Sequence, residues 1–182
     1  MDFIKVYDNV LTPKECTHYI NLIEMGEQHP GRVHSEDPDK RINPDIKHSF
    51  DVNFSQDYPA VTEYLITKVQ KLLENYLEDV KTIIPIKSCE LFSGRKYPEG
   101  EGFYKRHVDN FGPYTIKRSI TILIYLNTVE GGELEFPLQK RKIDPAPGRV
   151  VMFPSYWTHP HLAHKTSKGD RYLVRTFVLG ID

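Results

Sequence analysis

The chain has 182 residues, of which 39% are hydrophobic and 27% are charged, and its formal net charge is -1. This composition is typical of a folded globular chain, and the length suits a single domain over residues 1–182. A nearly neutral chain has no overall field that would attract nucleic acid or an anionic membrane, so neither is expected as a partner.

The first third of the chain predicts supporting elements. Residues 3–7 alternate apolar and polar side chains, as in a short strand. Thr12, Pro13 and Glu15 then match an N-cap, a first helical residue and the second half of a capping box. Apolar residues at helical spacing follow, and they predict a helix that ends at about residue 27.

The segment 28–47 is polar and rich in proline, histidine, aspartate and arginine, which predicts a long loop. Residues 49–54 alternate as a strand, and an apolar stripe over residues 61–76 predicts a second helix that covers a sheet. A long loop in a compact domain serves as a lid or is simply mobile, and both interpretations stay open for residues 28–56. Basic side chains in or near it are candidates to hold an acidic group: Arg32, His34, Arg41 and Arg106.

From residue 83 onward the pattern changes to short strands separated by turns that contain glycine or proline. The expected strands are 87–97, 102–109, 118–126, 132–136, 149–153 and 171–179. Early helices followed by short strands predict one α+β domain whose sheet curls into a barrel or jelly roll.

Two cysteines, Cys16 and Cys89, lie far apart and without CxxC spacing. This pattern favours neither a disulfide framework nor a thiolate zinc site, and it is typical of a reducing compartment. Cys16 falls on the apolar side of the first helix and is expected to be a core thiol. The N-terminal residues resemble no signal peptide and no segment is long and apolar enough for a membrane span, so the expected location is cytoplasmic.

A possible metal site begins at His107 and Asp109, which are two residues apart and would project from the same face of a strand. The segment 153–161 offers a further imidazole, from His159 or His161. Two imidazoles and one carboxylate form the facial triad of non-haem iron(II) oxygenases, which leaves positions open for small ligands. A hydrogen-bonded surface pair and a hydrolytic zinc site are the alternatives.

Arg171 opens the last expected strand, ten residues after His161. A guanidinium binds a carboxylate through two parallel hydrogen bonds, so Arg171 is suited to hold one end of a dicarboxylate. A surface ion pair is the other interpretation of an arginine at this place.

Several short motifs occur in a fixed order: Tyr97 to Gly100 (YPEG), Tyr104 to Asn110 with HxD, Arg118 to Asn127 (RSITILIYLN), Gly131 to Leu134 (GGEL), Pro147-Gly148, and His161 to Tyr172. In this order they resemble the 2-oxoglutarate/iron(II) oxygenases, and most of all the prolyl 4-hydroxylase branch, which includes the oxygen-sensing enzymes. The resemblance covers roughly residues 87–179.

The resemblance implies a double-stranded β-helix (jelly roll) with N-terminal supporting helices. It implies that His107, Asp109 and His161 are the iron ligands and catalytic centre, and that Arg171 binds the distal carboxylate of 2-oxoglutarate. By the same resemblance Tyr125 hydrogen-bonds that carboxylate and Tyr97 lines the pocket near iron, although packing alone would also explain two strand tyrosines. The implied cofactors are Fe(II), 2-oxoglutarate and O2, with ascorbate as a candidate reductant.

The third ligand is chosen among three histidines by the spacing between the ligand histidine and the downstream arginine in the family that this chain resembles. His161 has this spacing to Arg171 and follows a proline. His159 is the second choice, and His164 is expected to face solvent. Lys165-Thr166 departs from the apolar turn usual in the family, which affects the expected loop path. Two strand arginines could reach the pocket, but strand arginines more often form structural pairs, so both are left outside the core site: Arg118 and Arg175.

The implied activity is hydroxylation of an unactivated C–H bond with decarboxylation of 2-oxoglutarate to succinate. The resemblance favours a prolyl residue of a peptide or protein as substrate, and a free amino acid or small metabolite is the alternative. Asp109 argues against halogenation, because the related halogenases replace this carboxylate by a small residue. A zinc hydrolase and a non-catalytic binding module of the same fold are the remaining alternatives.

Overall fold

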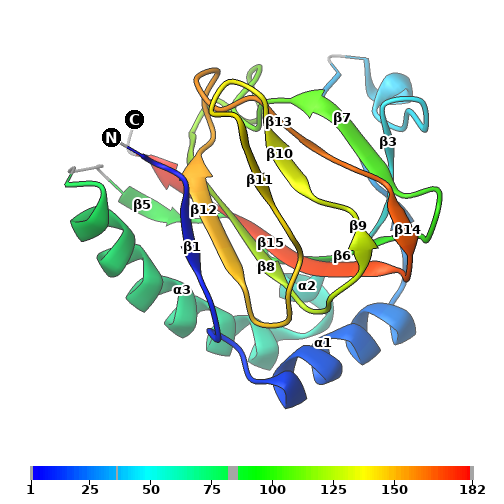
Figure 1. Ribbon diagram of the computed structural model, residues 1–182, viewed down its shortest axis with the longest axis horizontal. Helices are drawn as coiled ribbons and strands as arrows, with labels where there is room; N and C mark the ends of the chain where they lie inside the picture. Colours follow the sequence, from blue (N-terminus) through cyan, green and yellow to red (C-terminus); the bar gives the residue numbers. More distant parts are fainter. Residues whose placement is uncertain (1, 36, 82–85, 181–182) are drawn as a thin grey trace.

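The computed structural model describes residues 2–35, 37–81 and 86–180 (Figure 1). The predicted single domain, 1–182, also includes a few positions that lie outside these ranges. The described helices are α1 (Pro13–Met25), α2 (Phe54–Asp57) and α3 (Pro59–Asp79). None of the helices in the described ranges has the combination of length and apolarity that crossing a bilayer requires.

The capping box predicted for the first helix is confirmed. The Thr12 hydroxyl accepts a hydrogen bond from the Glu15 backbone N–H (3.3 Å), and the Glu15 carboxylate accepts one from the Thr12 N–H (2.6 Å). Reciprocal caps of this kind satisfy backbone donors that have no partner inside the helix. The helix ends at Met25, two residues earlier than expected, and the Gly26 N–H closes its last turn on the Leu22 carbonyl (3.0 Å).

Antiparallel strands form a large sheet and a small sheet that face each other (Figure 1). The large sheet runs in the order β1 (Lys5–Tyr7), β12 (Val150–Pro154), β8 (Arg118–Tyr125), β15 (Arg171–Gly180), β6 (Ser93–Tyr97), β4 (Phe50–Val52) and β2 (His29–Pro30), and β5 (Ile86–Cys89) also pairs with β15. The small sheet runs in the order β11 (Arg141–Ile143), β10 (Leu134–Phe136), β13 (His161–Ala163), β7 (Phe103–His107) and β3 (Lys47–His48). A separate pair consists of β9 (Glu130–Gly131) and β14 (Thr166–Lys168). This arrangement confirms the predicted jelly roll.

Alternation along the central strands divides the core into two parts. Ile122 of β8 and Val174 of β15 face the helices, where they are fully buried with Leu65 of α3 and its neighbours. Leu123 and Leu173, one residue away, belong instead to the interior between the two sheets. Because successive side chains of a strand point to opposite faces, the odd-numbered residues of β8 and β15 line that interior.

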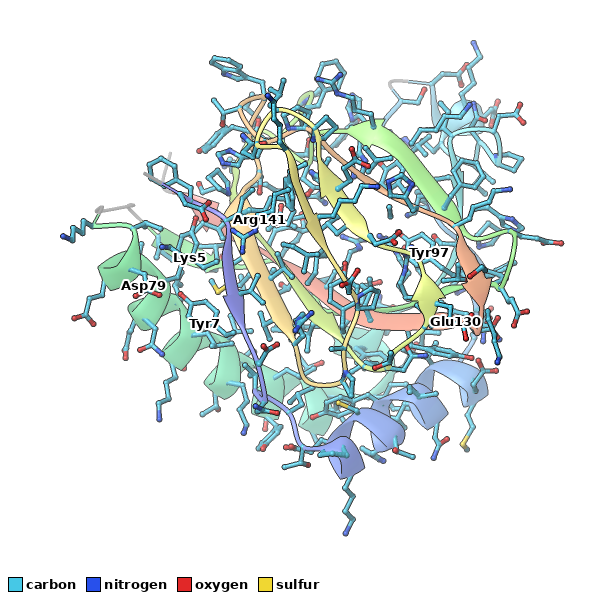
Figure 2. The ribbon with its side chains drawn as sticks, in the orientation of Figure 1. Lys5, Tyr7, Asp79, Tyr97, Glu130 and Arg141 are labelled. Carbon is cyan, nitrogen blue, oxygen red and sulfur yellow. The ribbon has the colours of Figure 1, made fainter. Side chains whose placement is uncertain are left out.

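Helices α1 and α3 lie along the outer face of the large sheet, as the predicted supporting helices required (Figure 1). The edge strand β1 is tied to α3 by the Tyr7 hydroxyl, which donates a hydrogen bond to Asp79 (2.8 Å; Figure 2). Cys16 is buried in the helix-side core, which confirms it as a core thiol, and Cys89 lies half-buried on β5; both are free thiols. The helices therefore support the sheet from outside and leave its inner face to the site.

Some predicted boundaries were wrong. The expected strand 87–97 is two strands, β5 and β6, because the backbone between them turns to bond Phe177 and the Ser55 side chain. The expected loop 28–47 contains β2, a 3-10 turn (Pro38–Lys40) and β3. Strands β11, β13 and β14 were not predicted, since their residues (RKI, HLA and TSK) show no alternation of apolar and polar side chains.

Candidate active site

Two histidines lie opposite each other on adjacent strands of the small sheet. His107 ends β7 and His161 begins β13, and the antiparallel register pairs these two residues directly. Directly opposed side chains on one face of a sheet are close neighbours, and here the ring centroids lie 4.3 Å apart. The Tyr104 ring stacks on the His107 imidazole at a centroid distance of 3.4 Å and limits its rotation.

Asp109 reaches the histidines from a loop. The predicted strand 102–109 was wrong at its end, because β7 stops at His107. The backbone N–H of Asp109 and that of Asn110 both donate to the Ser155 carbonyl (3.1 and 2.9 Å), which turns the chain back toward the interior. The Thr121 hydroxyl then donates to Asp109 Oδ2 (2.7 Å) and fixes the carboxylate.

The three side chains converge on one point. His107 Nε2 lies 3.6 Å from Asp109 Oδ1, and His161 Nε2 lies 3.4 Å from Asp109 Oδ2. One ligand atom from each residue falls within 4.8 Å of the other two. His107 Nδ1 and His161 Nδ1 each lie within hydrogen-bond distance of a backbone carbonyl, of Lys105 (2.8 Å) and His159 (3.0 Å). A carbonyl only accepts, so each proton resides on Nδ1 and each Nε2 lone pair is free for a metal.

The charges of the cluster also suit a divalent metal. Burial lowers the pKa of His161 to about 4, so this imidazole is neutral at pH 7. Burial raises the pKa of Asp109, but the two histidines and the Thr121 hydroxyl lower it by more. The net pKa therefore lies below its usual value. Metal ligands must be deprotonated, and His161 and Asp109 already are. This donor set fits Fe(II) and also accepts zinc.

The other two histidines of the segment lie elsewhere. His159 Nδ1 is within hydrogen-bond distance of the Thr158 hydroxyl (2.9 Å), and its ring packs edge-on against Phe3. His164, which was expected to face solvent, is half-buried and hydrogen-bonds Glu135 through Nε2 (2.5 Å). Among the described residues, the structure thus brings His161 to the other two members of the triad, and neither of its neighbours.

Arg171 lies in the interior at the start of β15, with only 1% of its surface exposed. Its Nη1 donates to the backbone carbonyls of Gly132 and His164, whereas Nε and Nη2 are buried and have no hydrogen-bond partner. A buried donor without a partner is costly, so this side chain is prepared for a ligand that accepts two hydrogen bonds. The surface ion pair considered from the sequence is excluded by this burial.

The glycine pair 131–132 makes room for the guanidinium. Both residues have positive φ (72° and 74°), a conformation that glycine adopts without strain. A Cβ added to Gly132 would lie 3.0 Å from Arg171 Nη1 and 2.7 Å from Thr166 Cγ2. The glycine therefore permits the close approach that places its carbonyl on Arg171.

The two predicted tyrosines line the same cavity. The Tyr97 ring lies against the Arg171 guanidinium, 4.1 Å from Cζ to the ring centroid. Figure 2 shows Tyr97 in the space between the two sheets. Tyr125 is 2% exposed, and burial raises its pKa to about 12, so its hydroxyl stays protonated as a hydrogen-bond donor. Their roles toward a co-substrate stay predictions.

The cavity between the sheets has a volume of about 350 Å³ and contains both the triad and Arg171. Arg32, His34 and Arg41 line it, as proposed for the basic residues near the loop, whereas Arg106 is exposed and does not. Arg118 and Arg175 line it too, and both also lie in the ion pairs that the sequence predicted, Arg118 with Glu90 (2.7 Å) and Arg175 with Asp51 (3.8 Å). Strand parity was the available signal, because Arg175 shares its face of β15 with Arg171.

Three further residues were missed. Asn127 donates to the Asp170 carbonyl (2.7 Å) and accepts from the Tyr172 N–H (2.9 Å), so it holds the backbone on both sides of Arg171. Arg95 of β6 and Lys47 of β3 also line the cavity. No local pattern identifies Lys47, since it reaches the site only through the pairing of β3 with β7.

Asp51 is the carboxylate that compensates Arg95 at the cavity wall. Arg95 donates to its two oxygens from Nε (2.6 Å) and Nη2 (2.7 Å). Burial raises the pKa of Asp51, but Arg95 and Lys47 lower it more, and the net pKa lies far below its usual value. Asp51 is therefore ionised in the folded protein over the whole ordinary pH range.

Replacing Asp51 by asparagine is expected to lower the free energy of unfolding by about 3 kcal/mol at pH 7, because it leaves buried cations without a counter-charge. A carboxylate whose pKa is lower in the folded than in the unfolded state stabilises the fold at pH values above its unfolded-state pKa. The difference in the free energy of unfolding between Asp51→Asn and the unmodified chain should therefore shrink as the pH falls below about 4. Urea unfolding at several pH values measures this. The control Asp8→Asn, in an exposed pair with Arg149, should change stability by about 0.5 kcal/mol or less. Equal effects of the two variants would contradict a special role for Asp51.

Comparison with known proteins adds a match to a family model. Residues 92–179 match the family model described as the 2OG-Fe(II) oxygenase superfamily. The chain is 28% identical over 147 residues to "Probable prolyl 4-hydroxylase 8" of Arabidopsis thaliana, which covers 78% of this chain and 47% of that protein. The chain thus spans about half the length of this curated relative.

Solved structures are similar over nearly the whole chain. A prolyl hydroxylase of Trichoplax adhaerens, in complex with a hypoxia inducible factor oxygen degradation domain peptide fragment, has a TM-score of 0.81 at 22% identity and covers 99% of this chain and 84% of its own. The viral collagen prolyl hydroxylase of Paramecium Bursaria Chlorella virus-1, in a 2OG complex, has a TM-score of 0.74 at 22% identity, with 99% and 97% covered. These likenesses show the shared jelly-roll fold.

Proposed function

Because residues 92–179 match the family model described as the 2OG-Fe(II) oxygenase superfamily, we propose that this chain is an Fe(II)- and 2-oxoglutarate-dependent dioxygenase that hydroxylates an unactivated C–H bond. One observation carries the proposal. The His-Asp-His cluster shares a cavity with a buried guanidinium that has two donors without a partner. A zinc hydrolase needs the cluster but does not require a dicarboxylate co-substrate, which this guanidinium is suited to bind.

Each residue has a defined part in this proposal. His107, Asp109 and His161 would hold Fe(II), and Arg171 would hold the distal carboxylate of 2-oxoglutarate through Nε and Nη2. Tyr125 would donate its phenolic proton to the same carboxylate. Iron, 2-oxoglutarate and O2 together would supply the oxidation, which inserts one oxygen atom into the C–H bond and yields succinate and carbon dioxide, with ascorbate as an auxiliary reductant.

The protein prepares these groups before any ligand arrives. The ring nitrogens, the carboxylate and the guanidinium are held by backbone carbonyls, Thr121 and Tyr97, so little ordering remains to be done on binding. The apolar side chains of Leu123, Leu134 and Leu173 line the same cavity and limit the water around the reacting groups.

We propose a prolyl residue of a peptide or protein as the substrate, and a free amino acid or small metabolite as the second class. The prolyl hydroxylases among the relatives support the first class. A cavity of about 350 Å³ would hold 2-oxoglutarate and one side chain, which suits either class. A cytoplasmic location stays part of the proposal, on the sequence pattern alone.

Anaerobic titration with Fe(II) and 2-oxoglutarate tests the proposed class. We expect a weak visible charge-transfer band that needs both components, followed by succinate formation on admission of O2. A zinc hydrolase would show activity without 2-oxoglutarate and no band, and a binding module would show no turnover. Absence of the band in folded protein contradicts the dioxygenase. For the substrate, proline-containing peptides are compared by mass spectrometry with matched peptides in which alanine replaces proline.

A further inference from the structure

A second group of cations lies at the end of the cavity away from Arg171. On β15, Arg171, Leu173 and Arg175 share the face that lines the cavity. Arg95 on the neighbouring strand β6 pairs in register with Leu173 and faces the same way. Four residues of a strand span about 13 Å, so the two arginines of β15 stand at opposite ends of the site.

This group has more positive charge than its one carboxylate neutralises. Asp51 is occupied by the two hydrogen bonds from Arg95. Lys47 Nζ and Arg175 Nη2 lie 3.7 and 3.8 Å from the Asp51 carboxylate, which is beyond hydrogen-bond distance. Lys47 Nζ instead donates to the Arg32 carbonyl (3.2 Å). Three cations therefore surround a single anion.

Arg175 also has an unused donor. Its Nε is buried and without a hydrogen-bond partner, which is the same condition that marks Arg171 as a ligand-binding residue. Burial, and next repulsion from Arg95, lower the pKa values of both Arg175 and Lys47. Among the described residues, no side chain accepts a hydrogen bond from the Arg175 Nε–H.

The rest of the cavity wall does not supply an anion for this group. Seven of the lining side chains in the described part of the chain are arginine or lysine, and Asp109 is the one lining carboxylate. Asp109 belongs to the metal cluster, and Glu90 behind the wall is hydrogen-bonded to Arg118 by two contacts (3.1 and 2.7 Å). The cavity thus keeps an excess of positive charge after its ion pairs are formed.

We propose that Arg175, supported by Lys47 and Arg95, forms a second anion subsite that binds a carboxylate of the primary substrate. The proposal rests on the proposed dioxygenase function and narrows its substrate class to molecules with a carboxylate near the C–H bond that is oxidised. That carboxylate is an acidic side chain beside a prolyl residue or the α-carboxylate of a free amino acid. In both cases a guanidinium and an ammonium neutralise the same group.

Calorimetric titration of the protein saturated with Mn(II) and 2-oxoglutarate tests the subsite without turnover. Two matched pairs of probes are used: N-acetyl-glutamyl-proline amide against its glutaminyl counterpart, and L-proline against L-prolinamide. In at least one pair we expect the carboxylate member to bind more tightly by about tenfold or more. The peptide pair identifies a side-chain carboxylate, and the proline pair identifies an α-carboxylate.

Variants assign the preference to the subsite. Arg175→Met should abolish the preference, Arg175→Lys should keep part of it, and Arg141→Met should leave it intact. Arg141 carries the same charge but pairs with Asp2 at the β11 edge of the small sheet, away from Tyr97 (Figure 2), and does not line the cavity. Arg175→Met should keep the affinity for 2-oxoglutarate, because Arg171 holds that ligand.

Two results with the unmodified protein would overturn the subsite: equal binding of both members of each pair, or binding of no probe at millimolar concentration. Two results with Arg175→Met would also overturn it: a retained preference for the carboxylate member, or weakened binding of 2-oxoglutarate. The first two need no variant, so a folding defect does not obscure them. Failure of Mn(II) and 2-oxoglutarate to bind at all would instead reject the dioxygenase itself, and the subsite with it.

Discussion

Alanine at His107, Asp109 or His161 is expected to remove the Fe(II)-dependent charge-transfer band and to lower succinate formation by more than about 100-fold. Loss of a residue that only orients a metal ligand already costs 10- to 100-fold, and a ligand itself should cost more. The three atoms lie within 4.8 Å of one another, and two ligands hold a divalent ion poorly without the third. Anaerobic titration with Fe(II), followed by a succinate assay, measures both effects.

His159→Ala is the matched control for these variants. It removes an imidazole from the same segment, but its hydrogen bond runs to Thr158, and His161 is oriented by the His159 backbone carbonyl, which the substitution keeps. We expect unchanged iron affinity with lowered thermal stability, since the side chain is buried. An intact band in His161→Ala together with a lost band in His159→Ala would show that His159, and not His161, is the third iron ligand.

The sequence predicted the chemistry of the triad better than its geometry. Apolar runs bounded by turn residues over 118–126 and 171–179 predicted the two strands that carry Thr121 and Arg171, because both runs are long enough to be recognised. The reason given for the pairing of His107 with Asp109 was wrong, since Asp109 lies past the end of β7. Its carboxylate is placed by Ser155 and Thr121, and contacts of this separation have no local signature.

The cationic end of the cavity was also not predictable from local sequence patterns. Arg95 meets Asp51 across 44 residues of sequence, and β13 is recognisable only through its register with β7. A three-residue strand in a polar segment has neither the length nor the composition that predicts it. The family resemblance located His161 where periodicity could not, whereas Arg95 and Lys47 in the cavity wall had to come from the structure.

The two sheets divide the work of the site between them. The small sheet supplies His107 and His161, and the loop that follows β7 supplies Asp109. All three face the interior from one side. The large sheet supplies Arg171 and Arg175 from the other side, through the odd-numbered face of one strand. A dicarboxylate held by the first arginine therefore extends toward the metal ligands, and the remaining space lies beside the second. This division separates the expected effects of the two arginines.

Arg171→Met is expected to raise the KM for 2-oxoglutarate by roughly 100-fold or more, because it removes the partner of a buried carboxylate. The value of kcat should change less, since this contact is the same in the ground state and the transition state. Initial rates of succinate formation over a range of 2-oxoglutarate concentrations separate the two constants. Arg171→Lys should recover only part of the loss, because an ammonium cannot reproduce the two parallel hydrogen bonds.

Pyruvate, a 2-oxo acid that lacks the distal carboxylate, gives the matched ligand control. The unmodified protein should bind 2-oxoglutarate far more tightly than pyruvate, and in Arg171→Met this discrimination should collapse to about tenfold or less, because the distal carboxylate then has no cation to meet. The comparison is made within one variant, so a lower stability caused by the freed Gly132 and His164 carbonyls affects both ligands equally. If Arg171→Met still prefers 2-oxoglutarate as strongly as the unmodified protein does, another cation holds the distal carboxylate, and Arg175 is the one on the same face of the same strand.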